Sequence, residues 1–98
     1  MNLSDPAQRF VRAQDSLSCD IDGEIAVLNP DSKQYFGLTE VAALVWEELE
    51  SPKSFDAIVS EVMRVYDVKE AECRRSLSNF ILEMCKLGLV IPDGSEVR

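Results

Sequence analysis

Residues 33–50, KQYFGLTEVAALVWEELE, pass from the pattern of a β-strand to that of an α-helix with almost no loop between them. Residues 34–38 are aromatic and apolar enough to form a strand. From Leu38 onward, apolar residues recur at i, i+3, i+4, i+7, i+8 and i+11, which predicts a helix with one unbroken apolar stripe. Thr39 is the natural N-cap between the two elements. The stretch therefore predicts a strand that runs directly into an amphipathic helix.

Two more strands are predicted before this stretch. Residues 16–29, SLSCDIDGEIAVLN, contain an Asp-Gly pair, which favours the type I′ turn of a tight hairpin. The alternation of Leu17, Cys19 and Ile21 predicts that these three side chains form the buried face of the first strand. The continuous apolar run at residues 25–28 leaves the register of the second strand open, or indicates that both of its faces are covered. A second turn, Asn-Pro-Asp-Ser, completes an antiparallel meander of three strands.

Two further helices follow the first. Residues 55–66 repeat the same apolar spacing after Ser54, a second candidate N-cap, and residues 70–87 carry a third apolar stripe that ends before Gly88. Three such stripes can bury one another and one face of a sheet. We therefore expect an α+β, winged-helix-like fold, in which a three-stranded antiparallel sheet is followed by a three-helix bundle.

The chain of 98 residues is long enough for one domain, which we place at residues 16–91, between an N-terminal arm at residues 1–15 and a C-terminal tail at residues 92–98. No segment has the apolar run of a signal peptide or a membrane span, so we expect a cytoplasmic protein. Ten Lys and Arg against 18 Asp and Glu give a net charge of −8. This charge repels phosphate and anionic lipid, so we expect neither nucleic acid nor a membrane as a partner.

The residue types offer little for catalysis or for metal binding. There is no histidine, and Cys19, Cys73 and Cys85 lack the spacing of a disulfide framework or a zinc site. These cysteines indicate small packing residues in a reducing compartment, and the chain has no histidine that could activate one of them as a nucleophile. Because a phosphate-binding glycine loop and a nucleophile elbow are also missing, we expect no enzyme activity, no metal and no cofactor.

The strand at residues 34–38 is predicted to be an edge of the sheet. It contains no proline and no charge, although natural edge strands are usually blunted by such residues. One interpretation is that the chain's own terminus or the third helix covers this edge. The other is that an extended peptide docks there as a fourth strand, with Gly37 allowing a close approach.

The third predicted helix has a second, smaller apolar arc beside its core stripe. At about 100° per residue, this arc collects Ser78, Leu82 and Cys85, next to Arg74 and Arg75. The arc either packs beneath the sheet or the arm, or forms one wall of a groove whose other wall is the edge strand. The two arginines are then either solvated or placed to meet acidic residues of a ligand.

These residues resemble those of the PqqD-like family, the peptide-recognition elements of ribosomal natural-product pathways. The resemblance spans about residues 16–91 and is carried by DGEIAVLNPDSKQYFGLTEVAALVWEEL, SFDAIVSEVMRVYDV and FILEMCKLGLV, in that order. It implies that the leader of a precursor peptide adds antiparallel to the third strand, in a cleft beside the third helix. Transferred onto this chain, the implied contacts are Lys33, Gln34, Tyr35, Phe36 and Gly37 on the strand and Arg74, Arg75, Ser78, Leu82 and Cys85 on the helix.

The resemblance implies a non-catalytic adaptor that captures a leader peptide by β-augmentation and delivers it to a maturation enzyme. The strand-to-helix stretch looks most like the stand-alone leader-binding protein of lasso-peptide biosynthesis, which works with a leader peptidase and a cyclase. One alternative is a peptide chaperone for a radical-SAM enzyme of the PQQ pathway. Another is a winged-helix DNA-binding regulator, although glutamates offset the basic residues of the third helix.

Overall fold

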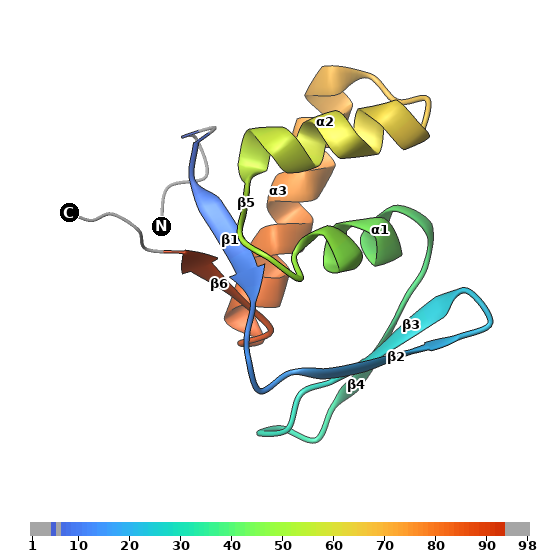
Figure 1. The fold of residues 1–98 in the computed structure, drawn as a ribbon, viewed down its shortest axis with the longest axis vertical. Helices are drawn as coiled ribbons and strands as arrows, with labels where there is room; N and C mark the ends of the chain where they lie inside the picture. Colours follow the sequence, from blue (N-terminus) through green and yellow to red (C-terminus); the bar gives the residue numbers. More distant parts are fainter. Residues whose placement is uncertain (1–4, 6, 94–98) are drawn as a thin grey trace.

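The structure is a computed structural model that describes residue 5 and residues 7–93 (Figure 1). In this part of the chain, six strands and three helices follow in the order β1 (Arg9–Arg12), β2 (Leu17–Ile21), β3 (Glu24–Leu28), β4 (Tyr35–Leu38), α1 (Glu40–Glu48), β5 (Lys53–Ser54), α2 (Phe55–Val65), α3 (Glu70–Lys86) and β6 (Val90–Asp93). The α+β fold with a three-stranded antiparallel sheet and three helices is confirmed. None of the helices in the described residues is both long and apolar enough to cross a membrane.

The predicted meander is the sheet β2-β3-β4, in which both strand pairs are antiparallel. Asp22 and Gly23 have φ angles of 53° and 85°, so the predicted hairpin turn with two positive φ angles is confirmed. The register places Leu28 between Leu17 and Tyr35. Since directly opposed residues share a face, every side chain of the sheet is thereby assigned to an inner face, toward the helices, or an outer face.

The predicted buried face of β2 is wrong. Leu17 and Ile21 are 59% and 52% exposed, and Cys19 is exposed as well. The inner face of β2 instead carries Ser18, whose hydroxyl accepts a hydrogen bond from the indole Nε1 of Trp46 at 3.1 Å. That bond fixes β2 in the phase opposite to the one expected, so the alternating apolar residues lie on the outer face.

A second sheet, β5-β1-β6, was not predicted. Its central strand, Arg9–Arg12, lies in the segment that we expected to be an N-terminal arm, and Phe10 is completely buried in the core. Arg12 connects this sheet to α1, because its Nε donates to the carbonyl of Trp46 at 2.8 Å and its guanidinium lies 4.8 Å from the centre of the Trp46 ring. Residues 94–98 of the expected C-terminal tail lie outside the described residues.

The starts of the first two helices differ in how they are capped. Ser54 caps α2 as predicted, since its hydroxyl accepts from the backbone N–H of Ala57 at 3.0 Å. Thr39 occupies the N-cap position of α1, but its side chain makes no capping hydrogen bond. The next residue, Glu40, has a φ of 54°, which residues other than Gly, Asn and Asp rarely adopt. The junction between β4 and α1 is therefore fixed by backbone geometry rather than by a side-chain cap.

Candidate functional site

The strand β4 is an edge strand in the part of the chain that the structure describes, because β3 is its only neighbour. At the start of the β3–β4 ladder, the backbone N–H of Asn29 donates to the carbonyl of Gln34 at 2.8 Å. Hydrogen-bonded pairs alternate with non-hydrogen-bonded pairs in an antiparallel ladder. The backbone of Phe36 therefore bonds to β3, whereas the N–H and C=O groups of Tyr35 and Gly37 point away from the sheet. This outward row is available to a further strand.

The side chains of β4 divide between the two faces as predicted. Phe36 and Leu38 face the core, and Tyr35 is 63% exposed on the outer face. A Cβ on Gly37 would lie 2.9 Å from a carboxylate oxygen of Glu24. Because this space is on the outer face, the glycine makes room for Glu24 and not for a strand in the plane of the sheet. Lys33 and Gln34, the other predicted strand contacts, are exposed in the loop before β4.

Two observations place the C-terminal half of α3 near the segments that flank β4. At one end, the side-chain Nδ2 of the buried Asn29, next to the start of β4, donates to the carbonyl of Leu87 at 2.5 Å. At the other end, Ala42 in the first turn after β4 lines the same pocket as Phe80.

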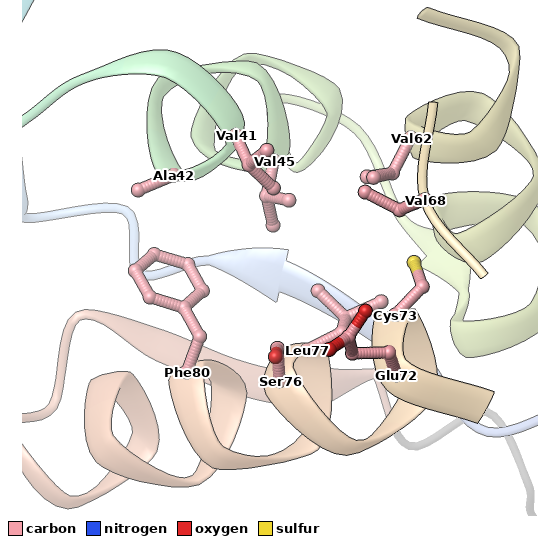
Figure 2. Close-up of a pocket in the computed structure, with 10 residues that line it drawn as sticks. All are labelled: Val41, Ala42, Val45, Val62, Val68, Glu72, Cys73, Ser76, Leu77 and Phe80. Atoms are coloured by element: carbon pink, nitrogen blue, oxygen red, sulfur yellow. The ribbon is translucent and has the colours of Figure 1, made fainter. Parts of the chain in front are cut away.

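Between the helices lies a pocket of about 430 Å³ (Figure 2). Figure 2 shows α1 on one side of it, α3 on the other, and α2 with the following connector closing one end. The lining residues are Val41, Ala42 and Val45 of α1, Val62 of α2, Val68 of the connector, and Glu72, Cys73, Ser76, Leu77 and Phe80 of α3. The lining is apolar apart from Ser76 and Glu72, which is the composition of a site for one or two apolar side chains.

The pocket lies on the flank of α3 opposite to the arc that the sequence indicated. At about 100° per residue, Ser76 and Phe80 lie on one side of the buried stripe through Leu77, and Ser78 and Cys85 lie on the other. The structure therefore does not bring Arg74, Arg75, Ser78, Leu82 or Cys85 to the pocket. Sequence periodicity could not select the pocket flank, because that choice depends on where α1 crosses α3.

Arg74, one of the predicted contacts, has partners within the fold. Its Nη2 lies 2.6 Å from Oδ1 of Asp56, its Nε lies 2.9 Å from Oε2 of Glu70, and its guanidinium is 6.0 Å from the centre of the Phe55 ring. The hydrogen bonds to Asp56 and Glu70 raise the pKa of Arg74. These contacts hold the start of α2 against α3, which is a structural role.

The two cysteines that are at least half-buried, Cys73 and Cys85, are protonated at neutral pH. Burial raises the pKa of the Cys73 thiol, which lines the pocket, and burial also raises the pKa of Cys85, which is half-buried. The packing role predicted for the cysteines is confirmed for Cys73 and wrong for the exposed Cys19. Within the described residues, no group of three or more His, Cys, Asp or Glu could hold a metal ion. The site thus offers backbone hydrogen bonds and apolar surface.

The model of the family described as coenzyme PQQ synthesis protein D (PqqD) matches residues 24–90, which include β3, β4, the three helices and the pocket. The chain belongs to the PqqD family. No curated protein is significantly similar to this PqqD-family chain in sequence.

Two solved structures have the same fold. "TbiB1 in Complex with the TbiA(beta) Leader Peptide" is 26% identical, with a TM-score of 0.76 over 89% of this chain and 99% of that one. "Lasso peptide synthetase B1 complexed with the leader peptide" is 19% identical, with a TM-score of 0.74 over 85% of this chain and 98% of that one. The second likeness shows the fold alone, and both confirm the predicted PqqD-like architecture.

Proposed function

We propose that this PqqD-family chain binds the leader segment of a ribosomal precursor peptide as a fourth strand beside β4. The observation that carries the proposal is the outward row of N–H and C=O groups at Tyr35 and Gly37, which no described segment pairs. Main-chain hydrogen bonds of this kind give affinity in β-augmentation. The structure of the similar protein TbiB1 in complex with a leader peptide supports the proposal. Residues 33–37 supply the strand contacts.

We propose that the second wall of the site is the pocket flank of α3. A strand added to β4 would lie between β4 and this flank, on which Ser76, Phe80, Glu83 and Leu87 follow at helical spacing. Phe80 and Leu87 are half-buried and apolar, and the pocket between α1 and α3 would take an apolar or aromatic anchor of the leader. The arc through Ser78 and Cys85 would require a peptide on the other side of α3, away from the pocket.

The chemistry of this site supports an adaptor role. Backbone pairing and an apolar pocket can capture a peptide without changing it, and we propose that the bound precursor is then passed to an enzyme. We propose that this enzyme is the leader peptidase of a lasso-peptide pathway in the cytoplasm, followed by the cyclase, because residues 33–50 resemble the lasso leader-binding protein and the similar protein TbiB1 forms a complex with a leader peptide. A radical-SAM enzyme of the PQQ pathway is the alternative client within the family.

Titration of a fluorescein-labelled leader with the protein tests the proposal by fluorescence polarisation. We expect saturable binding of the leader from the chain's own precursor and none of a scrambled leader of the same composition. Equal binding of the two peptides would contradict recognition at the site. A gel-shift assay with duplex DNA at low salt separates the adaptor from a winged-helix regulator, and we expect no shift because the chain carries a net charge of −8.

A further inference from the structure

The outer face of the β2-β3-β4 sheet is an exposed apolar surface. Leu17, Leu28 and Tyr35 form one row across the three strands, and Ile21 lies further along β2 on the same face. Leu17, Ile21 and Tyr35 are 59%, 52% and 63% exposed. The three helices lie on the inner side of this sheet, and no described element covers its outer face (Figure 1). A contiguous surface of large exposed apolar side chains is typical of a protein–protein contact.

Two carboxylates lie at one end of this outer sheet face. Asp22 and Glu24 lie at the hairpin tip beside Ile21, and both are exposed. Neither belongs to an ion pair within the described residues, where the five ion pairs involve other side chains. The surface that would cover this face therefore has an apolar centre and Lys or Arg at its rim. A second copy of the chain fits poorly, because each copy carries a net charge of −8.

A peptide strand beside β4 would extend this outer face. Because successive side chains of a strand alternate between faces, half of the guest's side chains would point toward the pocket flank of α3. The other half would point outward, next to Tyr35. A partner that contacts the outer sheet face would then contact the protein and the captured peptide together.

We infer that the outer sheet face docks the enzyme that processes the captured peptide, through a surface of that enzyme with an apolar centre and a basic rim. This inference rests on the proposed function. Since the bound peptide supplies part of the face, the enzyme binds the loaded protein more tightly than the empty one. The hairpin β2–β3 thus presents the peptide to the enzyme, whereas the edge of β4 captures it.

The test measures binding of the purified leader peptidase to the protein by isothermal titration calorimetry, with and without saturating leader. The variant Leu17→Thr/Ile21→Thr removes the apolar centre and keeps β-branched strand formers, and it leaves β4 untouched. Asp22→Asn/Glu24→Gln removes two rim charges, with Asn suited to the φ of 53° at that turn position. Val65→Thr, at a side chain of α2 that is 49% exposed, is the matched control.

We expect Leu17→Thr/Ile21→Thr to lower peptidase affinity by about tenfold or more with leader affinity unchanged. Asp22→Asn/Glu24→Gln should lower it by a smaller factor and flatten its salt dependence, while Val65→Thr changes nothing. Undiminished peptidase binding by the Thr variant, an equal loss in Val65→Thr, or no peptidase binding by the loaded wild-type protein overturns the inference. Sedimentation equilibrium could instead show that the wild-type protein is a dimer and that Leu17→Thr/Ile21→Thr is a monomer. That result would overturn the inference, because the outer sheet face would then bind a second copy of the chain. Failure of the proposed function is separate, because wild type would then not bind leader.

Discussion

Replacing Ser76 by Leu tests whether the pocket flank of α3 binds the leader. Ser76 is exposed and lines the pocket together with Phe80, so a Leu side chain at this position would enter the space proposed for the peptide's anchor. The helix itself should tolerate the change, since Leu is a better helix former than Ser. Filling part of the apolar pocket should also hold or raise the Tm. The expected result is a stable protein that binds leader poorly.

The expected loss of leader affinity in Ser76→Leu can be worked out from the burial of the anchor side chain. Burying one large apolar side chain of the leader in the pocket is worth about 1.5–3 kcal/mol. If the Leu side chain excludes that anchor, the dissociation constant for the leader rises roughly tenfold to a hundredfold. The backbone pairing at Tyr35 and Gly37 does not depend on the pocket, so residual binding should remain.

The matched variant is Ser78→Leu, the same change two residues further on the opposite flank of α3. Fluorescence polarisation with labelled leader gives the two dissociation constants, and thermal unfolding gives the two Tm values. We expect Ser76→Leu to weaken binding and Ser78→Leu to leave it within about twofold of wild type. The opposite order, at unchanged Tm, would refute the pocket flank and support the arc through Ser78, Leu82 and Cys85.

Four further predictions concern the edge strand, the ion pairs of Arg74, the buried Cys73 and the junction after β4. Tyr35→Pro should weaken leader binding about tenfold with little change in Tm, because it removes an outward N–H, and Tyr35→Ala measures the contribution of the side chain alone. Phe36→Pro should instead lower the Tm, because it removes an N–H that is bonded to β3. A lower Tm for Tyr35→Pro and weaker leader binding for Phe36→Pro would contradict this assignment of the hydrogen bonds. Arg74→Ala should lower the Tm without changing leader affinity. A weaker leader affinity would instead support the predicted contact between Arg74 and the leader. Burial raises the folded-state pKa of Cys73 above the ordinary 9.0, so its contribution to the free energy of unfolding is complete below that value and is lost as pH rises through the raised pKa. In urea unfolding, the free energy of unfolding should therefore fall less above about pH 9 in Cys73→Val than in wild type. Glu40→Asn should raise the Tm by a few degrees, since Asn tolerates the positive φ better, and an unchanged Tm would show that Glu40 carries no strain.

The elements that could be predicted are those specified by local signals. The hairpin follows from the Asp-Gly pair, and α2 follows from its apolar stripe and the Ser54 cap. The second sheet could not be predicted, because its strands are short and come from distant parts of the chain: Phe10 pairs with Lys53 on one side and Pro92 on the other. A two-residue strand such as β5 has no alternation to recognise.

The phase of β2 shows a different limit of sequence patterns. Alternation reveals that two faces differ, but it does not say which of them meets the helices. An apolar face on β2 is equally compatible with a core and with a docking surface. The hydrogen bond between Trp46 and Ser18 decides the phase, and it joins residues 28 positions apart. The apolar face of β2 that we predicted to be buried is the outer face that we propose as the enzyme-docking surface. An apolar docking surface on a strand has the same alternation as a buried face, which is why the prediction was wrong.

The junction after β4 explains why the edge and the pocket can act as one site. Thr39 is extended, Glu40 adopts a left-handed φ of 54°, and Val41 and Ala42 follow at once in the pocket wall. A left-handed conformation costs an ordinary residue about 1 kcal/mol, and such strain persists where the surrounding structure determines it. Here Leu38 on one side and the buried stripe of α1 on the other hold the junction in place. Because so few residues separate the outward backbone row from the pocket, a leader bound as we propose would meet its anchor site in a fixed register. A shift of one residue along the edge would move the anchor to the wrong face of the guest strand.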